Sequence, residues 1–217
     1  MNERSFDGLF VAEGSSDAPL GELVESLFLA RSVDIHLTRP DYSLLDEQVG
    51  KNLTARLKAG ISLMAGDPDV VVFHRDVDNT DHSKRRGEMR DALTGANSSG
   101  VLVPVIPLRM TEAWLLLDEA AIRTAAGNPN GRTKLNLPTV REVERLADPK
   151  KVLRETILTA ADVTGRRRER LAARFSSSRR QLLERLDPSG PVTELRSWQN
   201  LIADVDAAAL KLSLSPF

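Results

Sequence analysis

Cysteine is absent from this sequence of 217 residues, and aromatic residues make up only 4% of it. The absence of cysteine excludes a disulfide framework and thiolate metal sites, and it fits a reducing compartment. No apolar run approaches the roughly 20 residues that a membrane helix requires. The first ten residues, MNERSFDGLF, lack the basic and apolar segments of a secretory signal. We therefore expect a cytoplasmic protein with no membrane partner.

An excess of charge of either sign is also missing. The chain has 30 Lys and Arg against 31 Asp and Glu, a net charge of −1. Bulk electrostatics therefore neither recruits nor repels a polyanion, and contact with nucleic acid must come from a local patch. The apolar share of 41% and the charged share of 28% are ordinary for a globular protein. The length is enough for one large domain, or for one domain with an appendage.

Short apolar segments alternate with helical patterns in the first half of the chain, which is typical of a parallel sheet covered by helices on both faces. The predicted strands are residues 8–13, 33–37, 70–73 and 101–108. The predicted helices are residues 19–31, 44–65, 83–95 and 111–126. Right-handed crossovers bring the carboxyl ends of all four strands to one edge of the sheet, where ligands bind in such folds.

The character of the sequence changes after a loop at residues 127–138. Beyond it, only helical patterns occur. The sequence thus predicts an α/β domain at residues 1–138 and a helical C-terminal extension at residues 139–217, packed on that domain. Within the fourth strand, Pro104 and Pro107 predict a strand that ends or bends by Pro107, because proline cannot donate to a sheet ladder.

Acidic residues follow three of the four predicted strands. Glu13 ends the first strand and Asp17 comes four positions later; Asp76 and Asp78 follow the third strand, and Glu112 opens the helix after the fourth. Carboxylates that meet at one edge repel one another, and either take up protons or need a cation. Carboxylate oxygens suit Mg²⁺ or Mn²⁺. The pattern predicts metal-dependent phosphoryl chemistry.

Each acid also has a simpler interpretation. A single acid at a strand end or helix start is most often a cap, a turn residue or a solvated charge. Asp81 can cap the helix at residues 83–95, and Asp17 can cap the helix that opens at Pro19. The Asp76 and Asp78 pair is harder to explain in this way.

The order of these motifs, EG after one strand and DxD after a later one, resembles the Toprim fold of topoisomerases, primases and overcoming-lysogenization-defect nucleases. The stretches VAEGSSD, HRDVDNTD, VIPLRMTEAWLLLD and LADPKKVL are similar to a family of uncharacterised Toprim-like bacterial proteins with suspected roles in defence against phage. The resemblance covers about residues 8–155. It implies a Toprim-like (Rossmann-like) parallel sheet flanked by helices.

The resemblance also implies roles for the acids. Glu13 corresponds to the Toprim glutamate, a metal ligand or general base, and Asp76 and Asp78 correspond to the metal-binding aspartates. Glu112 corresponds to a further ligand or a family-specific acid. Asp17 stands where Toprim nucleases commonly have glutamate, and its shorter side chain reaches less far toward an ion. The function implied is a Mg²⁺- or Mn²⁺-dependent nuclease acting on DNA or RNA, with a protein partner in a defence or toxin-type operon, or an oligomeric state, as further expectations.

Two other functions stay open. The letters DVDNT match the DxDxT motif of haloacid-dehalogenase-like phosphatases, in which Asp76 would be the nucleophile. In those enzymes the motif follows the first strand of the core, whereas here it follows the third, and Asp81 comes directly after Thr80. The third function is a non-catalytic Toprim-like subunit that senses nucleotides or acts as a scaffold.

Basic residues form two groups that suit contact with nucleic acid. Residues 164–186 contain eight arginines against two glutamates, and arginine matches the geometry of phosphate well. The predicted contacts are Lys84, Arg85, Arg166, Arg167 and Arg168. The alternative for residues 164–186 is a solvated helix pair whose leucines face a core. His74 is expected to be structural, Trp114 is expected to pack in the core, and Trp198 is expected to dock the last helix.

Overall fold

A computed structural model of the chain describes residues 5–12, 14–46, 48–50, 52–77 and 81–214. The chain divides into two compact units. Unit 1 comprises residues 1–75, 80–106 and 200–217, and unit 2 comprises residues 76–79 and 107–199. This division differs from the predicted one. The main boundary falls after residue 106 and not after residue 138, and residues 200–217 belong to unit 1.

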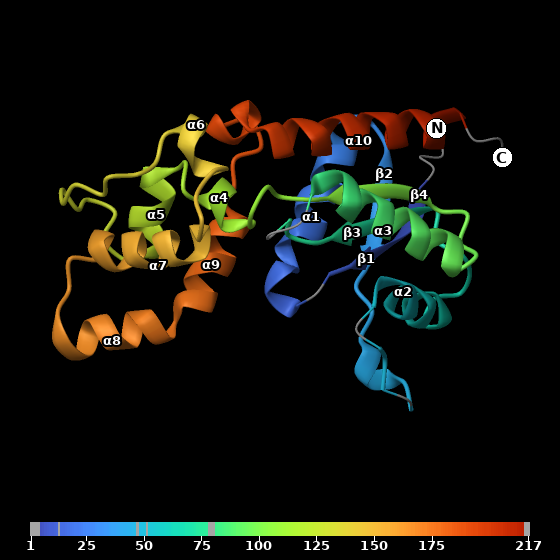
Figure 1. The fold of residues 1–217 in the computed structure, drawn as a ribbon, viewed down its shortest axis with the longest axis horizontal. Helices are drawn as coiled ribbons and strands as arrows, with labels where there is room; N and C mark the ends of the chain where they lie inside the picture. Colours follow the sequence, from blue (N-terminus) through green and yellow to red (C-terminus); the bar gives the residue numbers. More distant parts are fainter. Residues whose placement is uncertain (1–4, 13, 47, 51, 78–80, 215–217) are drawn as a thin grey trace. The chain divides into compact units, whose positions relative to one another are not determined.

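Unit 1 contains a four-stranded parallel sheet (Figure 1). Its strands are β1 (Ser5–Val11), β2 (Asp34–Thr38), β3 (Val70–His74) and β4 (Val101–Val105), in the spatial order β2-β1-β3-β4. Every residue of β3 is buried, as expected for an apolar run in the middle of a sheet covered on both faces. The predicted α/β class, with a Rossmann-like parallel sheet flanked by helices, is confirmed.

Helices cover both faces of this sheet. Those between the strands are α1 (Pro19–Leu29), α2 (Leu53–Ser62) and α3 (His82–Gly95), with short 3₁₀ turns η1 (Ser15–Asp17) and η2 (Tyr42–Leu44). A Cβ added at Gly21 of α1 would lie 3.5 Å from Phe10, and one added at Gly60 of α2 would lie 2.6 Å from Leu9. Because successive residues of a strand point to opposite faces, α1 and α2 lie on opposite sides of β1. α3 packs beside α2.

The last helix, α10 (Arg196–Leu214), contributes its residues from 200 onward to unit 1. Charged pairs join it to α3 and to the turn that follows α1. Arg86 of α3 donates two hydrogen bonds to Asp204, at 2.8 and 2.5 Å, and Arg31 pairs with Asp206. A segment predicted to belong to a C-terminal extension is therefore built into the sheet unit.

Unit 2 is helical. Its elements are α4 (Glu112–Leu115), α5 (Glu119–Ala125), α6 (Val140–Val143), α7 (Pro149–Ala160), α8 (Gly165–Ala173), α9 (Phe175–Glu184), the 3₁₀ turn η3 (Pro191–Glu194) and the start of α10. No strand occurs in residues 107–199, all of which are described. The expectation of purely helical structure beyond residue 138 is confirmed up to residue 214.

Two tryptophans form the centre of unit 2. Trp114 and Trp198 are both 1% exposed and meet edge to face, with ring centroids 5.2 Å apart and planes at 84°. Trp114 donates its indole N–H to the Ser197 hydroxyl at 2.8 Å, and that hydroxyl donates to Glu144 at 2.5 Å. The predicted core packing of Trp114 is confirmed, and Trp198 is the buried anchor at the start of the last helix, α10, as expected. The polar atoms from the Trp114 indole to Glu144 all have partners, whereas the buried indole N–H of Trp198 has none among the described residues.

Side-chain caps make two helices shorter than predicted. The Asn52 side chain accepts the backbone N–H of Ala55 at 2.7 Å, so α2 begins at Leu53 and not near residue 44. Asp118 caps α5 in the same way at 2.9 Å, which divides the predicted helix at residues 111–126 into α4 and α5. A capping residue has a non-helical backbone and therefore marks where a helix starts. None of the described helices is both long and apolar enough to span a membrane.

Pro104 lies inside β4 without interrupting it. β4 is an edge strand, the position where a strand tolerates proline. The backbone N–H of Val101 donates to Asp69 at 2.7 Å, and the carbonyl of Val105 accepts from Arg75 at 3.2 Å. Since alternate residues of a strand direct their backbone polar groups to the same side, Pro104 directs its nitrogen away from β3.

Candidate functional site

The chain reverses its direction across the sheet between β1 and β3. It passes from β1 outward to β2, returns past β1 to β3, and continues to β4. In open parallel sheets, ligands bind beyond the carboxyl ends of the two strands that flank such a reversal. Val11 is paired with Phe73 near these ends. The polar residues that follow Val11 and His74 in the chain are therefore the first candidates for a site.

Two of the predicted metal ligands, Glu13 and Asp78, lie outside the described residues. In the sequence, Glu13 comes two positions after the end of β1, and Asp76 and Asp78 come two and four positions after the end of β3. β1 and β3 are the strands that flank the reversal. The roles of Glu13 and Asp78 stay predictions, and only Asp76 of the three can be described.

Asp76 belongs to unit 2 and is held by Thr111 of the same unit. Its Oδ1 atom accepts the backbone N–H of Thr111 at 3.0 Å and the Thr111 hydroxyl at 3.1 Å. The next residue, Val77, donates its N–H to the carbonyl of Pro107 at 3.2 Å. Asp76 is partly exposed, whereas Thr111 is fully buried. The carboxylate of Asp76 is thus oriented by an anchored partner.

Asp17, the acid that follows EGSS, lies against His74 at the end of β3. Both residues belong to unit 1 and are buried, with 7% and 3% of their surface exposed. The Asp17 Oδ2 and His74 Nδ1 atoms are 3.5 Å apart. Ala18 is the N-cap of α1 and makes no side-chain cap, so the alternative interpretation of Asp17 as the helix cap is wrong. Its carboxylate is directed to a histidine, and its predicted role as a metal ligand gains no support.

Glu112 lies inside unit 2, in an ion pair that the sequence analysis did not identify. Its Oε1 atom accepts from Arg179 Nε at 2.8 Å, and the two residues are only 3% and 5% exposed. A charge so enclosed depends on its partner, because removing one member leaves the other unpaired. The contact favours a structural role for Glu112 over the predicted one beside a metal. Arg179 precedes the buried Leu182 and Leu183 by three and four positions, and this spacing is the signal that could have predicted its burial.

Among the residues that the structure describes, no group of three or more His, Asp or Glu side chains is arranged to hold a metal ion. Glu13 and Asp78 are not among those residues. The described acids are each directed to a different partner: Asp76 to Thr111, Asp17 to His74 and Glu112 to Arg179. A metal centre at this edge therefore remains a prediction that depends on Glu13, Asp76 and Asp78.

The predicted phosphate contacts at the start of α3 differ in their surroundings. Lys84 is exposed. Arg85 is mostly enclosed, with 13% of its side chain exposed, and pairs with Glu88 at 3.0 Å. Glu88 also lies 3.4 Å from Arg75. Lys84 therefore suits contact with a large polyanion better than Arg85 does. Asp81 caps this helix by accepting the N–H of Ser83 at 2.8 Å, so the simpler interpretation of Asp81 is confirmed.

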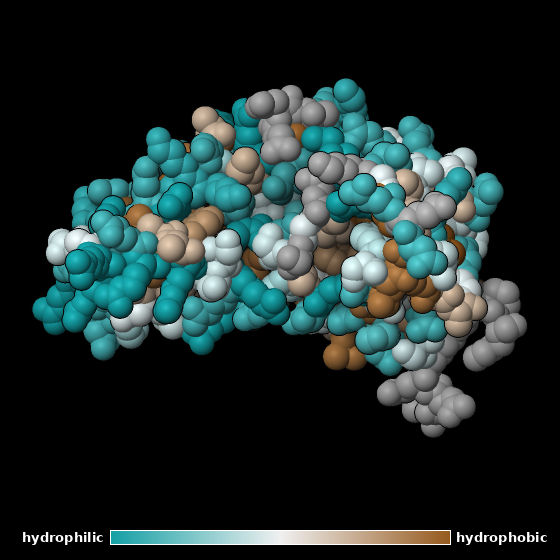
Figure 2. Space-filling model, turned by 90° about the horizontal axis from the view of Figure 1, so that it is seen from below, coloured by the Kyte–Doolittle hydropathy of each residue, from teal (hydrophilic) through white to brown (hydrophobic). Residues whose placement is uncertain are grey.

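The other predicted contacts, Arg166, Arg167 and Arg168, lie on α8 in unit 2. All three are exposed, and α8 has no buried residue. Arg168 donates one hydrogen bond to the carbonyl of Leu158 at 3.1 Å. α8 lies at the lower left of Figure 1, and Figure 2, seen from below, shows a strongly hydrophilic surface there. We call this surface the α8 basic face.

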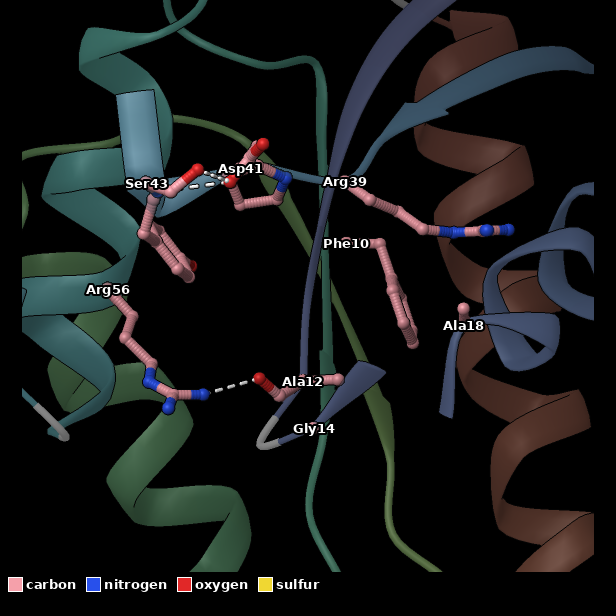
Figure 3. Close-up of a pocket in the computed structure, with 10 residues that line it drawn as sticks. Phe10, Ala12, Gly14, Ala18, Arg39, Asp41, Ser43 and Arg56 are labelled. Carbon is pink, nitrogen blue, oxygen red and sulfur yellow. Dashed lines mark hydrogen bonds between the residues drawn. The ribbon is translucent and has the colours of Figure 1, made fainter. Parts of the chain in front are cut away.

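A cavity at the ends of β1 and β2 was missed by the sequence analysis. It has a volume of about 390 Å³ and belongs to unit 1 (Figure 3). We call it the strand-end cavity. It is lined by Phe10, Ala12, Gly14, Ala18, Arg39, Pro40, Asp41, Tyr42, Ser43 and Arg56. Its residues come from three separate segments without a shared motif, so no local pattern could have predicted it.

Comparison of the chain with protein-family models, with curated proteins and with solved structures gave no match. The basis for a function is therefore the sheet topology, the contacts of the predicted residues and the chemistry of their side chains.

Proposed function

We propose that this protein carries out Mg²⁺- or Mn²⁺-dependent phosphodiester chemistry on a nucleic acid, with Glu13, Asp76 and Asp78 as the metal ligands. The observation that carries the proposal is Asp76, which follows β3 by two residues at the reversal of the sheet and has its carboxylate oriented by Thr111. A carboxylate fixed in this way can present an oxygen to a cation without further reorganisation.

The donor set fits a hard divalent cation. Mg²⁺ is bound in proteins by one or two carboxylates, and keeps its other positions for water and phosphate oxygens. When bound, such an ion supplies Lewis acidity, which activates water and stabilises the leaving oxygen of a phosphodiester. The contribution of the chain is to hold the carboxylates, as the Thr111 N–H and hydroxyl do for Asp76. Asp17 and Glu112 are left out, because each has a buried partner of its own.

The substrate class follows from the exposed cations. The α8 basic face offers Arg166, Arg167 and Arg168, and arginine binds phosphate oxygens through charge-assisted hydrogen bonds. Such contacts to the backbone of a nucleic acid carry no sequence information and weaken with salt. Lys84 adds an exposed charge in unit 1. We therefore propose sequence-independent binding of DNA or RNA, and a role in defence against phage stays an expectation from the resemblance.

Cleavage assays with purified protein test this function. Supercoiled plasmid, single-stranded DNA and single-stranded RNA are incubated with Mg²⁺, with Mn²⁺ or with EDTA, and we expect cutting only with a divalent ion. Asp76→Asn keeps the shape of the side chain but removes its charge, and loss of one group that stabilises charge in the transition state lowers the rate on the order of 10²- to 10³-fold. Asp78→Asn should act alike.

The matched control is Asp91→Asn. Asp91 is exposed on α3 and has no hydrogen bond or ion pair within the described part of the chain, so its replacement should leave the cutting rate unchanged. Intact substrates under every divalent ion, with folded protein, would rule out the nuclease. Release of phosphate from simple monoesters, with a beryllium-fluoride adduct at Asp76, would instead support the phosphatase. The absence of both activities would indicate the non-catalytic subunit.

A further inference from the structure

The short helix α8 is attached to unit 2 along one side only. Among its residues, Leu171 and Ala172 are partly shielded and all the others are exposed. Arg168 lies on the same side as these two, because it donates to the carbonyl of Leu158 in α7 at 3.1 Å. We call the side with Leu171, Ala172 and Arg168 the inner side of α8, and the opposite side its outer side.

Three arginines follow one another along the outer side at intervals of four residues. They are Arg166, Arg170 and Arg174, the last being the residue directly after the helix. Four residues turn the chain through about 400°, so each arginine is displaced by only about 40° from the one before. All three are exposed, and none pairs with an acid in the described part of the chain. Arg170 makes one contact, from its Nε to the Arg166 carbonyl at 3.4 Å. We call the three the α8 arginine row.

The α8 arginine row matches a series of phosphates. A rise of about 1.5 Å per residue places its members about 6 Å apart along the helix. Successive phosphates of one nucleic-acid strand are separated by a distance of the same order. Arginine presents a planar fork of donors that fits a phosphate group, and each such contact is a charge-assisted hydrogen bond. A strand that lies along α8 can thus place a phosphate near each member of the row.

The two flanks of the outer side carry opposite charge. From Arg166 the row turns toward one flank, where Arg167 also lies, at about 100° per residue. Glu169 lies about 60° from Arg166 on the other flank. It is exposed and has no ion pair within the residues that the structure describes. A helix in a groove of a duplex lies between two phosphate backbones, and cations on both flanks would then be needed. α8 has them on one flank only.

A duplex that touches α8 from outside meets the same obstacle. The minor groove is about 6 Å wide, and a helix with its side chains is about 10 Å across. A helix that rests on one backbone therefore also comes near the second, and the charge of Glu169 repels that second backbone. A single strand has no second backbone, so it fits the distribution of charge on α8 better.

A lipid surface fits α8 less well than a nucleic acid does. Helices that bind membranes bury large apolar side chains in the bilayer. The one large apolar residue of α8, Leu171, lies on the inner side. Figure 2 shows a strongly hydrophilic surface in this region. Attraction to the outer side of α8 thus depends on charge, which a phosphate backbone supplies.

We propose that the α8 arginine row follows the phosphate backbone of a single strand of nucleic acid, with Arg167 beside the row. Arg168 is not part of the row, because it lies on the inner side and donates to Leu158. The inference names the form of the substrate in the proposed function, and it rests on that function for the cutting of the strand. The binding itself requires neither a metal ion nor Asp76.

Fluorescence anisotropy on the full chain in EDTA tests the proposal. The probes are a labelled single-stranded DNA oligonucleotide, the same sequence as RNA, and the duplex of that DNA, each at several salt concentrations. We expect the single strands to bind more tightly than the duplex. One phosphate contact contributes about 0.7 to the slope of log affinity against log salt for a single strand, so Arg170→Gln should make the slope shallower by about that amount.

The matched control is Arg168→Gln. Arg168 is also an exposed arginine of α8, but it lies on the inner side, so its replacement should leave the slope nearly unchanged. Neither Arg168 nor Arg170 is buried, and thermal unfolding should show that both variants are folded. A slope unchanged by Arg170→Gln, or equal changes in the two variants, would overturn the proposal.

Glu169→Gln tests the preference for a single strand. Removal of this exposed charge should raise the affinity for the duplex about two- to fivefold, and the affinity for the single strand by less. No gain for the duplex, or a duplex that binds wild type more tightly than the single strand does, would overturn the assignment. Binding to phosphatidylserine vesicles that Arg170→Gln abolishes would assign α8 to lipid and would also overturn it.

Repeating the measurement on Asp76→Asn separates this proposal from the function proposed above. Asp76 is held by Thr111 and is not part of α8, so the affinity for the single strand should not fall while cutting is lost. Binding as expected without any cutting by wild type would overturn the proposed function alone. An unchanged rate of cutting of single strands after replacement of the whole α8 arginine row by Gln would overturn this proposal alone.

Discussion

The two units of the chain treat their arginines differently. In unit 2, Arg179 is 5% exposed and bonded to the equally enclosed Glu112, so its charge is satisfied within the protein. In unit 1, Arg56 lies on the wall of a cavity, between a carbonyl and an aromatic ring. The enclosed ion pair is part of the architecture of unit 2, whereas Arg56 lines an open cavity of unit 1. The surroundings of a charged residue separate these two settings.

The largest effect on stability is expected from breaking the enclosed pair. Glu112→Gln removes the charge that Arg179 faces, and loss of one partner of a buried ion pair costs about 3–5 kcal/mol in the free energy of unfolding. Urea unfolding measures this cost. The double replacement Glu112→Leu with Arg179→Met should recover most of it, because the cost comes from an unpaired charge.

An exposed pair in the same unit provides the control. Glu184 accepts from Arg180 at 2.7 Å on α9, with roughly half of each side chain in solvent, at 42% and 55%. Glu184→Gln should therefore cost less than about 1 kcal/mol. Equal costs for Glu112→Gln and Glu184→Gln would contradict the structural role of Glu112. A fall in Mn²⁺ affinity without loss of stability would return Glu112 to the predicted metal site.

A smaller effect is expected from the α8 basic face, where arginines of unit 2 are left in solvent. Replacing Arg166, Arg167 and Arg168 together by Gln should leave the unfolding curve nearly unchanged, since none of them is buried. If each contacts one phosphate, the slope of log affinity for DNA against log salt should become shallower by up to about 2.7. Fluorescence anisotropy at several salt concentrations measures the slope, and an unchanged slope would remove α8 from the nucleic-acid interface.

The smallest effect concerns a carboxylate of unit 1. Partial desolvation raises the pKa of the exposed Asp67, but hydrogen bonds from Ser98 and Ser99 outweigh it and lower the pKa below the ordinary value of 3.8. A depressed folded-state pKa stabilises the fold above the unfolded-state value, and the stabilisation is lost as the pH falls through the folded-state value. Asp67→Asn should thus be less stable than wild type at pH 7, with the difference shrinking below about pH 4. Unfolding at both pH values checks this, and a difference independent of pH would contradict it.

The sheet was predictable because its signals are local. The VVVF run predicts a buried strand, and β3 spans Val70–His74 with every residue buried. The two prolines of the fourth apolar run predict a strand that ends or bends by Pro107, and β4 ends at Val105. The lengths of α2 and α5 were not predicted, because Asn52 and Asp118 each stop a helix by a single hydrogen bond that is indistinguishable in sequence from a solvated side chain.

The candidate site was predictable only in part, because its contacts join distant residues. Asp76 could be chosen from its distance to a strand, but its anchor, Thr111, lies 35 positions away. The pairing of Glu112 with Arg179 spans 67 positions. The strand-end cavity depends on how the loop after β2 packs against α2, which no periodic pattern encodes. Spacing predicts which acids follow strands, and tertiary packing decides what each of them contacts.

The proline in β4 has a consequence for how copies of this chain meet. The nitrogen of Pro104 is directed away from β3 and carries no hydrogen, so the open side of the edge strand is missing a donor. A strand from a second copy could not complete a regular ladder there, and edge-to-edge growth of the sheet, a common route to aggregation, is blocked at that side.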